Sequence, residues 1–541
     1  MDNRFSLFNI DSKDFQDKLA QLISPSVIHE NANAPLRSLI EYVKRRLGVK
    51  SVLFEEEYID SDYQSLYSKW YSKAFKQYSS LCQRLHFFTG DIDLKSLYDG
   101  SISDALYCGY SVITPLIRGR VGRTVIKPFQ DSIQINQQSN FPVILESPSY
   151  AHLFGRRFKV MGCPYISQDV MVMVCAQSAI WMAIQFLHNR YGRYGIQRNF
   201  PHEITDAATL YLPWGGRIFP SGGLTVLHMV NALSNLGYSP ILDLKSEKTE
   251  SWAPLNWIVK YIDSEIPIIL SIKNPPHAIL AIGSLQGSDS FDTITNSSAI
   301  SSIDNWTSGI IVNDDGLGPY KIMPRIDGQY EFLSQGSDRD LVPANSHDNS
   351  DENWWKSMNQ VDGVIVPLPK EVSIQARHTD EIVAGVLRRD ADNNVLSRFE
   401  LQKSNNQFLA YTLDLLPSEF PLSSPLDDSV VTRAYLIRSM EFLKRVKSSY
   451  PPKLADFYTK QHYPLYIWVI ELMLRSELEK SGPKLRQIFG EIILDSTANK
   501  YAPSLFSLHM NGFVVKRDID SEKFVSTDLF IIERYKSSHP H

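Results

Sequence analysis

The sequence is poor in cysteine, with four in 541 residues. Four cysteines in a chain of this length do not form the disulfide framework of a small secreted protein. They also lack the paired C-x-x-C spacing of a structural zinc site. The first residues lack the apolar core of a signal peptide. We therefore expect a protein of a reducing compartment, the cytoplasm.

A surplus of positive charge and long apolar runs are also missing. The 55 lysines and arginines are outnumbered by 60 aspartates and glutamates, which gives a formal net charge of -5. Such a balance does not draw in nucleic acid or anionic lipid. No stretch approaches the roughly 18 apolar residues that a membrane span requires. The sequence predicts a soluble protein that has neither a nucleic-acid partner nor a membrane partner.

Several catalytic motifs are absent too. There is no G-x-x-x-x-G-K-[ST] phosphate loop and no G-x-S-x-G elbow, so NTPase and serine-hydrolase functions have no support. No short-range ligand pair such as H-E-x-x-H is present, and we expect no cofactor and no metal.

The length of the chain predicts several domains. We expect an N-terminal α+β domain over residues 1–155, a central domain over 156–370 and a C-terminal α+β domain over 371–541. In the flanks, helical spacing covers Tyr63–Phe88 and Asp428–Val446, and both are expected to be helices. The roles of the two flanks are not indicated by any motif.

One stretch of the central region carries chemistry. A short extended segment begins at Tyr165 and is followed by two polar residues. An apolar helix is then predicted, with Cys175 at or near its start. The unsatisfied amide N–H groups of a helix start favour a thiolate over a thiol. Cys175 is therefore a candidate nucleophile if the fold brings a base beside it.

Two later strands offer such partners. His277 opens a predicted strand, and Asp314 ends the next one. Acyl transfer by cysteine needs a nucleophile, a base and a group that fixes the tautomer of the base. Gln168 precedes Cys175 and could donate its amide to an oxyanion. Taken singly, each residue has an ordinary alternative role. Cys175 could be a small buried hydrophobic residue, His277 a structural histidine and Asp314 a solvated aspartate in a turn.

The order of helix-borne Cys, strand-borne His and Asp resembles the papain-like cysteine peptidase superfamily, and in particular the bacteriocin-leader (double-glycine) peptidases. The similarity covers roughly 210 residues, over about 160–370. It is carried by the stretches Pro164-Tyr-Ile-Ser-Gln168, Cys175-Ala-Gln-Ser-Ala-Ile-Trp-Met182, Gly223–Tyr238, Pro276-His-Ala-Ile-Leu-Ala-Ile-Gly283 and Val312-Asn-Asp-Asp-Gly316.

The resemblance implies an α+β papain-like domain, in which a helix carrying Cys packs on an antiparallel sheet carrying His and Asp. It makes Cys175 the nucleophile and His277 the general base, with Asp314 orienting the base and Gln168 in the oxyanion hole. The sequence departs from the family pattern in two places that bear on these roles. The Gln168–Cys175 spacing is one residue longer than in many relatives, and Asp315 replaces the usual Pro, so that Asp314 and Asp315 compete for the third role.

These observations predict a cysteine peptidase that cleaves a protein or peptide substrate, with flanks for recognition, regulation or assembly. Three alternatives remain. The same triad also transfers acyl groups to amines, and a papain-like module can serve as an interaction platform without catalysis. A Cys/His/Asp set also suits zinc, although a zinc site would need a further ligand or a bound water.

Overall fold

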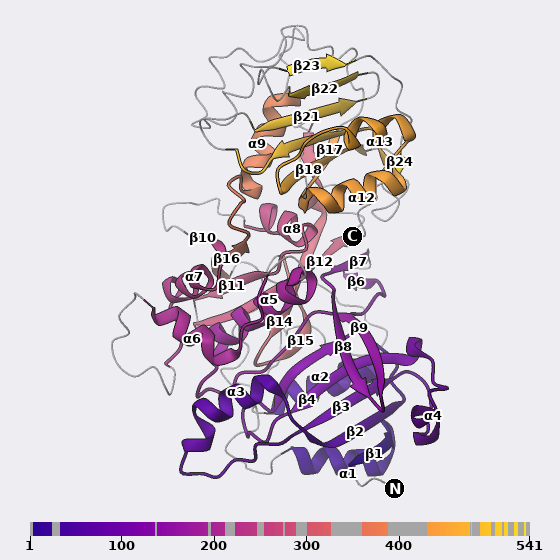
Figure 1. Cartoon of the computed structure of the whole chain (residues 1–541), viewed down its shortest axis with the longest axis vertical. Helices are drawn as coiled ribbons and strands as arrows, with labels where there is room; N and C mark the ends of the chain where they lie inside the picture. The colour runs from indigo at the N-terminus through magenta and orange to yellow at the C-terminus, as the bar shows by residue number, and fades with distance from the viewer. Residues whose placement is uncertain are drawn as a thin grey trace.

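The computed structural model describes residues 4–23, 33–135, 138–192, 196–210, 222–245, 254–273, 276–287, 300–325, 360–387, 430–475, 478, 487–498, 504–510, 513–517, 524–527 and 535–536. The fold is mixed α+β, and its strands form three large sheets. Figure 1 shows the parts stacked along the long axis, with the first sheet in indigo and purple at the bottom and the last in orange and yellow at the top. No helix among the described residues is long and apolar enough to cross a membrane.

The first sheet has five strands in chain order, all antiparallel. Helices α1 and α2 bury apolar side chains in the same core as the inner residues of the sheet. The short helix α4 and the hairpin β8–β9 complete this part. The bounds are β1 Phe5–Asn9, α1 Lys13–Leu22, α2 Ala34–Arg45, β2 Ser51–Tyr58, α3 Ser61–Lys69, β3 Cys82–Phe88, α4 Leu94–Tyr98, β4 Tyr107–Ile113, β5 Val121–Ile126, β8 Ser147–Leu153 and β9 Arg156–Gly162.

The helix expected over Tyr63–Phe88 is wrong for most of its length. Only α3 and a short 3₁₀ turn at Tyr71–Lys73 are helical, and Cys82–Phe88 forms strand β3. This strand lies in the middle of the sheet, hydrogen-bonded to β2 on one side and β4 on the other. Pairing on both edges therefore overrides a local pattern with helical spacing.

The central sheet orders its strands β10-β16-β11-β12-β14-β15, again antiparallel throughout. The hairpin of β6 and β7 joins it by pairing β7 with β12, so residues before 155 belong to the central sheet. Gly283 allows this approach, because a Cβ there would lie 2.5 Å from the carbonyl oxygen of Val143. The bounds are β6 Ile133–Ile135, β7 Gln138–Ile144, β10 Ser239–Leu244, β11 Ile268–Ile272, β12 His277–Gly287, β14 Thr307–Asp314, β15 Gly318–Pro324 and β16 Val361–Leu368.

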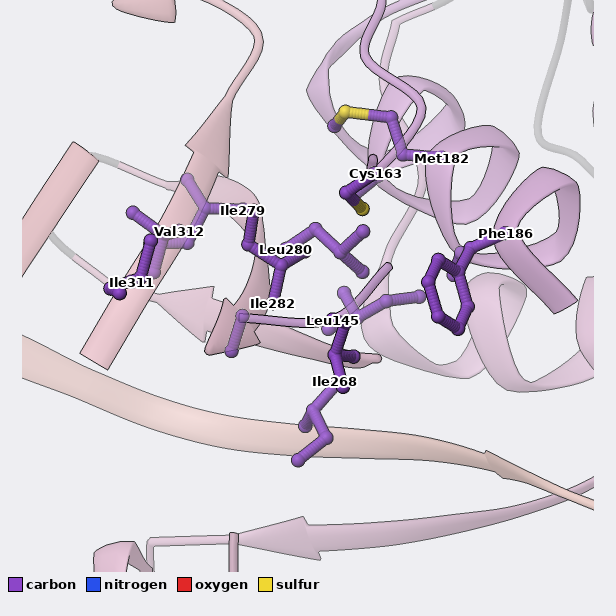
Figure 2. Packing of buried hydrophobic residues seen from close by; sticks show 14 of the residues in the cluster. Leu145, Cys163, Met182, Phe186, Ile268, Ile279, Leu280, Ile282, Ile311 and Val312 are labelled. Carbon is purple, nitrogen blue, oxygen red and sulfur yellow. The ribbon is translucent and has the colours of Figure 1, made fainter. Parts of the chain in front are cut away.

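Helix α5, Cys175–Tyr191, packs against the central sheet. Figure 2 shows Phe186 of this helix extending toward Leu145, and Cys163 lying between Met182 of the helix and Leu280 of β12. All of these side chains are buried. Helices α6 Pro201–Thr209, α7 Val226–Asn235 and α8 Leu255–Asp263 complete this part. The Thr225 side chain caps α7 by accepting a hydrogen bond from the N–H of His228.

The third sheet orders its strands β13-β17-β18-β20-β21-β22-β23. Its first strand, β13, comes from the central region and pairs with β17 in parallel. The helix expected over Asp428–Val446 is wrong in its first half, because β17 occupies Val430–Arg438 before α12 begins. The bounds are β13 Ile300–Ser302, α9 Ala376–Leu387, β17 Val430–Arg438, α12 Ser439–Ser449, α13 Pro452–Thr459, β18 Tyr466–Leu474, β19 Gln487–Ile488, β20 Gly490–Asp495, β21 Leu505–Met510, β22 Phe513–Arg517, β23 Phe524–Thr527 and β24 Tyr535–Lys536.

A buried ion pair joins the third sheet to the central part. Arg433 of β17 places its Nε atom 2.7 Å from Oδ2 of Asp263, at the end of α8, and both side chains are almost completely buried. The N–H of Leu436 also donates to the Ser264 hydroxyl, at 2.7 Å. Truncating one partner of a buried ion pair leaves the other charge buried without that partner. This junction is therefore sensitive to substitution.

Candidate active site

Cys175 is the first residue of helix α5, as the sequence predicts, and Val174 is the N-cap. The residues that follow it, from Ala176 to Leu187, are buried, which fixes the helix and therefore the position of its first residue. Cys175 itself is half-buried, whereas the other three cysteines are buried, and none of the four is in a disulfide. The side chain of Cys175 interacts with that of His277 and helps to raise the pKa of His277.

The turn before Cys175 is held by Asp169, a residue whose role the sequence did not indicate. Its Oδ1 atom accepts hydrogen bonds from the N–H groups of Met171, Val172 and Met173, at 2.8, 2.8 and 2.9 Å. Val170 within this turn has a φ of 58°, a conformation that costs energy for a β-branched residue. The buried carboxylate thus stabilises a strained turn directly before the helix start.

The first sheet positions the segment that leads into this turn. Tyr165 exchanges two backbone hydrogen bonds with Thr124 of β5, each 2.9 Å long, and Ser167 bonds to Val121 of the same strand. The Tyr165 hydroxyl also donates to the carbonyl oxygen of Asp314, at 3.1 Å. The N-terminal flank is therefore part of the scaffold that supports the site.

His277 and Asp314 meet at one edge of the central sheet. His277 is the first residue of β12 and Asp314 is the last of β14, and these strands are antiparallel neighbours. The start of one and the end of the other therefore lie side by side. The Nε2 atom of His277 is 3.1 Å from Oδ2 of Asp314. The structure thus brings His277 and Asp314 together at this edge of the sheet, as the order of the strands predicts.

The carboxylate of Asp314 is held in one orientation. Its Oδ1 atom accepts hydrogen bonds from the N–H groups of Gly316 and Leu317, at 2.7 and 2.8 Å, which leaves Oδ2 for His277. Burial raises the pKa of Asp314, but the charge and hydrogen bond of His277 and these backbone donors outweigh it. The pKa of Asp314 is therefore lowered, and the group is a carboxylate near neutral pH.

His277 is stabilised in its protonated form. Burial alone lowers its pKa, but the charge of Asp314 and the hydrogen bond to it outweigh this effect, with smaller contributions from the Cys175 thiol and Asp315. The pKa of His277 is consequently well above its usual value of 6.5. Asp314 lies at Nε2 of the ring, so Nδ1 is the nitrogen through which His277 can interact with the thiol. His277 thus interacts with both the Asp314 carboxylate and the Cys175 side chain.

Asp315 lies beside this pair without a hydrogen bond to it. Its Oδ1 atom is 3.5 Å from Nε2 of His277, and neither of its carboxylate oxygens has a hydrogen-bond partner among the described residues. Its side chain is only 1% exposed. Burial and the charge of Asp314 raise the pKa of Asp315 to about 7, against the opposing effect of His277.

Gln168 is half-buried, next to Asp169 in the turn. In the described part of the chain, no hydrogen bond joins its side chain to Cys175, His277 or Asp314. Its predicted place in an oxyanion hole remains a prediction. The N–H group of Cys175, at the first turn of α5, has no intrahelical acceptor and is a second candidate donor.

A cavity of about 490 Å³ lies at the opposite end of α5. Leu187 and Tyr191 contribute to its wall, together with Tyr238 and residues of β17 such as Arg438. A helix rises about 1.5 Å per residue, so the 17 residues of α5 place this cavity some 25 Å along the helix from Cys175. The cavity is therefore separate from the thiol site.

A comparison of the whole chain with models of protein families, with curated proteins and with solved structures finds no match.

Proposed function

We propose that this chain is a thiol hydrolase that cleaves peptide or amide bonds, with Cys175 as nucleophile. The observation that carries the proposal is the position of His277, which hydrogen-bonds to Asp314 and interacts with the side chain of Cys175. A nucleophile, a base and an orienting group in contact are what covalent catalysis by cysteine requires. The papain-like arrangement of helix and antiparallel sheet, implied by the family resemblance, is part of the same proposal.

The reaction begins with the sulfur of Cys175 and the ring of His277. The thiolate attacks the carbonyl carbon of the scissile bond, and the imidazolium of His277 gives its proton to the departing amine. A thioacyl group then remains on Cys175. Neutral His277 next removes a proton from water, which attacks the thioester and releases the acid. Asp314 keeps Nδ1 of the ring directed at the sulfur throughout, because its own Oδ1 is fixed by two backbone donors.

The interaction between the Cys175 side chain and His277 favours catalysis over a non-catalytic interaction module. Such a module needs no interaction between these two residues. The choice between water and an amine as the final acceptor depends on the substrate, and we propose water.

Digestion of a proteome-derived peptide mixture, followed by mass spectrometry, tests the proposal. The wild-type protein should produce shortened peptides, and Cys175→Ala should produce none. Cys163→Ala is the matched control, because Cys163 is buried and its hydrogen-bonding neighbours lie outside the site. Cleavage that survives in Cys175→Ala contradicts the proposal, and joined peptides would indicate acyl transfer to an amine instead.

A further inference from the structure

Asp315 has no function in the reaction just described, yet it is buried beside the reacting groups. Two carboxylates and one imidazole converge here: one ligand atom from each of His277, Asp314 and Asp315 lies within 4.8 Å of the other two. Burying a second carboxylate without a hydrogen-bond donor is costly. Both oxygens of Asp315 nevertheless lack such a partner.

The separations between these atoms fit a metal ion. Zinc binds imidazole nitrogen and carboxylate oxygen at about 2.0–2.2 Å, and a tetrahedral arrangement then places neighbouring ligand atoms about 3.4 Å apart. The two distances from Nε2 of His277 are 3.1 Å to Asp314 and 3.5 Å to Asp315. A metal ion could therefore bind with only small side-chain movements.

The charges of the set also suit a divalent ion. Two carboxylates and a neutral imidazole balance a charge of +2, and they are ligands of the kind that zinc and similar ions accept. Asp315 takes the place of the thiol in the Cys/His/Asp set that the sequence suggests. The Cys175 sulfur is not among the clustered atoms, so a water molecule would complete the coordination.

We propose that His277, Asp314 and Asp315 form a binding site for a divalent transition-metal ion such as Zn²⁺. The ion takes the Nε2 lone pair of His277 and replaces the hydrogen bond between His277 and Asp314. If the proposed hydrolase function is correct, the bound ion inhibits it, because the imidazole is no longer oriented or charged by Asp314. Metal binding itself does not depend on that function.

Titration of metal-free protein with Zn²⁺, in competition with a chromophoric chelator, tests the site near neutral pH. Wild type and Cys175→Ala should each bind one ion with similar affinity, because the thiol is not a ligand. Asp315→Asn should bind about 100-fold more weakly, as expected when an ionised oxygen ligand is lost. Ions that Asp315→Asn still binds with the affinity of the wild type are those that bind elsewhere on the chain.

A second measurement uses only the wild type and so does not depend on a variant folding. The absorption spectrum with Co²⁺ should show intense tetrahedral d–d bands but no thiolate-to-cobalt charge-transfer band. Absence of saturable binding, an unchanged affinity in Asp315→Asn, or a thiolate band would each overturn the proposal. If the protein binds zinc in this way but cleaves no peptide, the metal site stands and the hydrolase function fails.

Discussion

The Nε2 atom of His277 lies 3.1 Å from Oδ2 of Asp314 and 3.5 Å from Oδ1 of Asp315. The two carboxylates are consecutive in sequence and both are buried, yet only Asp314 makes the hydrogen bond. Only Asp314 is held by backbone donors. These two residues therefore form a natural matched pair for substitution.

Asp314→Asn should lower the rate of acylation of Cys175 by about 100-fold or more, because an amide neither stabilises the imidazolium nor fixes its tautomer. Asp315→Asn should change the rate by less than about 10-fold, because the hydrogen bond between His277 and Asp314 stays intact. Release of p-nitrophenol from an activated ester measures both rates in metal-free buffer. Equal losses in the two variants would contradict the assignment of Asp314 as the orienting group.

The protonation of His277 gives a second prediction. Asp314 raises the pKa of His277 above 6.5 against the effect of burial. The stabilisation of the folded state by this pair is therefore fully present below pH 6.5 and is lost as pH rises through the raised pKa. In Asp314→Asn burial dominates, so the pKa of His277 should fall by more than about one unit.

NMR of protein with ¹³C-labelled histidine measures this titration, and His277→Gln identifies the signal. Asp315→Asn is the control, because Asp315 is the smaller of the two carboxylate contributions to the pKa of His277. A His277 signal that titrates near pH 6.5 in the wild type and does not move in Asp314→Asn would contradict the account.

Asp169 is expected to position Cys175 rather than to react. Asp169→Ala removes the acceptor of three backbone N–H groups, so we expect a loss of about 2–4 kcal/mol in unfolding free energy, together with slower acylation of Cys175. Asp169→Asn keeps an Oδ1 acceptor and should lose less. Chemical denaturation measures the stability. An unfolding free energy equal to that of the wild type in Asp169→Ala would show that the turn does not depend on this carboxylate.

The third sheet carries a buried acid whose titration should affect stability. Tyr450 donates a 2.6 Å hydrogen bond to Oε2 of Glu491, and burial raises the pKa of Glu491 from 4.5 to about 8. The folded state therefore binds this proton more tightly than the unfolded state, and stability falls as pH rises from 4.5 through 8. Above that pH, Glu491→Gln should be more stable than the wild type by roughly 3–5 kcal/mol.

Denaturation at several pH values tests this prediction. The difference between wild type and Glu491→Gln should be small near pH 4.5 and should grow with pH. Two stability curves that run parallel over this range would show that Glu491 does not titrate as its burial implies.

Much of the site could be predicted from the sequence, because its parts lie at element ends with strong local signals. The apolar run after Cys175 predicted a helix start, and two apolar strands placed His277 and Asp314 at the same edge. Asp169 and the hydrogen bonds of Tyr165 could not be predicted in this way. They depend on a strained turn and on contact with β5, which no local pattern encodes.

The errors in the predicted secondary structure and domain boundary also arise from contacts between distant parts of the chain. Cys82–Phe88 follows a helical pattern but pairs with strands on both edges, and Val430–Arg438 is held between β13 and β18. In both stretches, hydrogen bonds to distant strands outweigh the local preference. The same is true of β7, which joins the central sheet although it precedes the predicted boundary at residue 155.

The central claim is that His277 activates Cys175 as a nucleophile. Site-resolved mass spectrometry of protein treated with p-nitrophenyl acetate tests it most directly. We expect an acetyl group on Cys175 alone, lost with time as water resolves the thioester, and acylation about 100-fold slower in His277→Ala. Acylation of Cys175 at equal rates in the two proteins, or acetyl groups on the buried cysteines instead, would contradict the account.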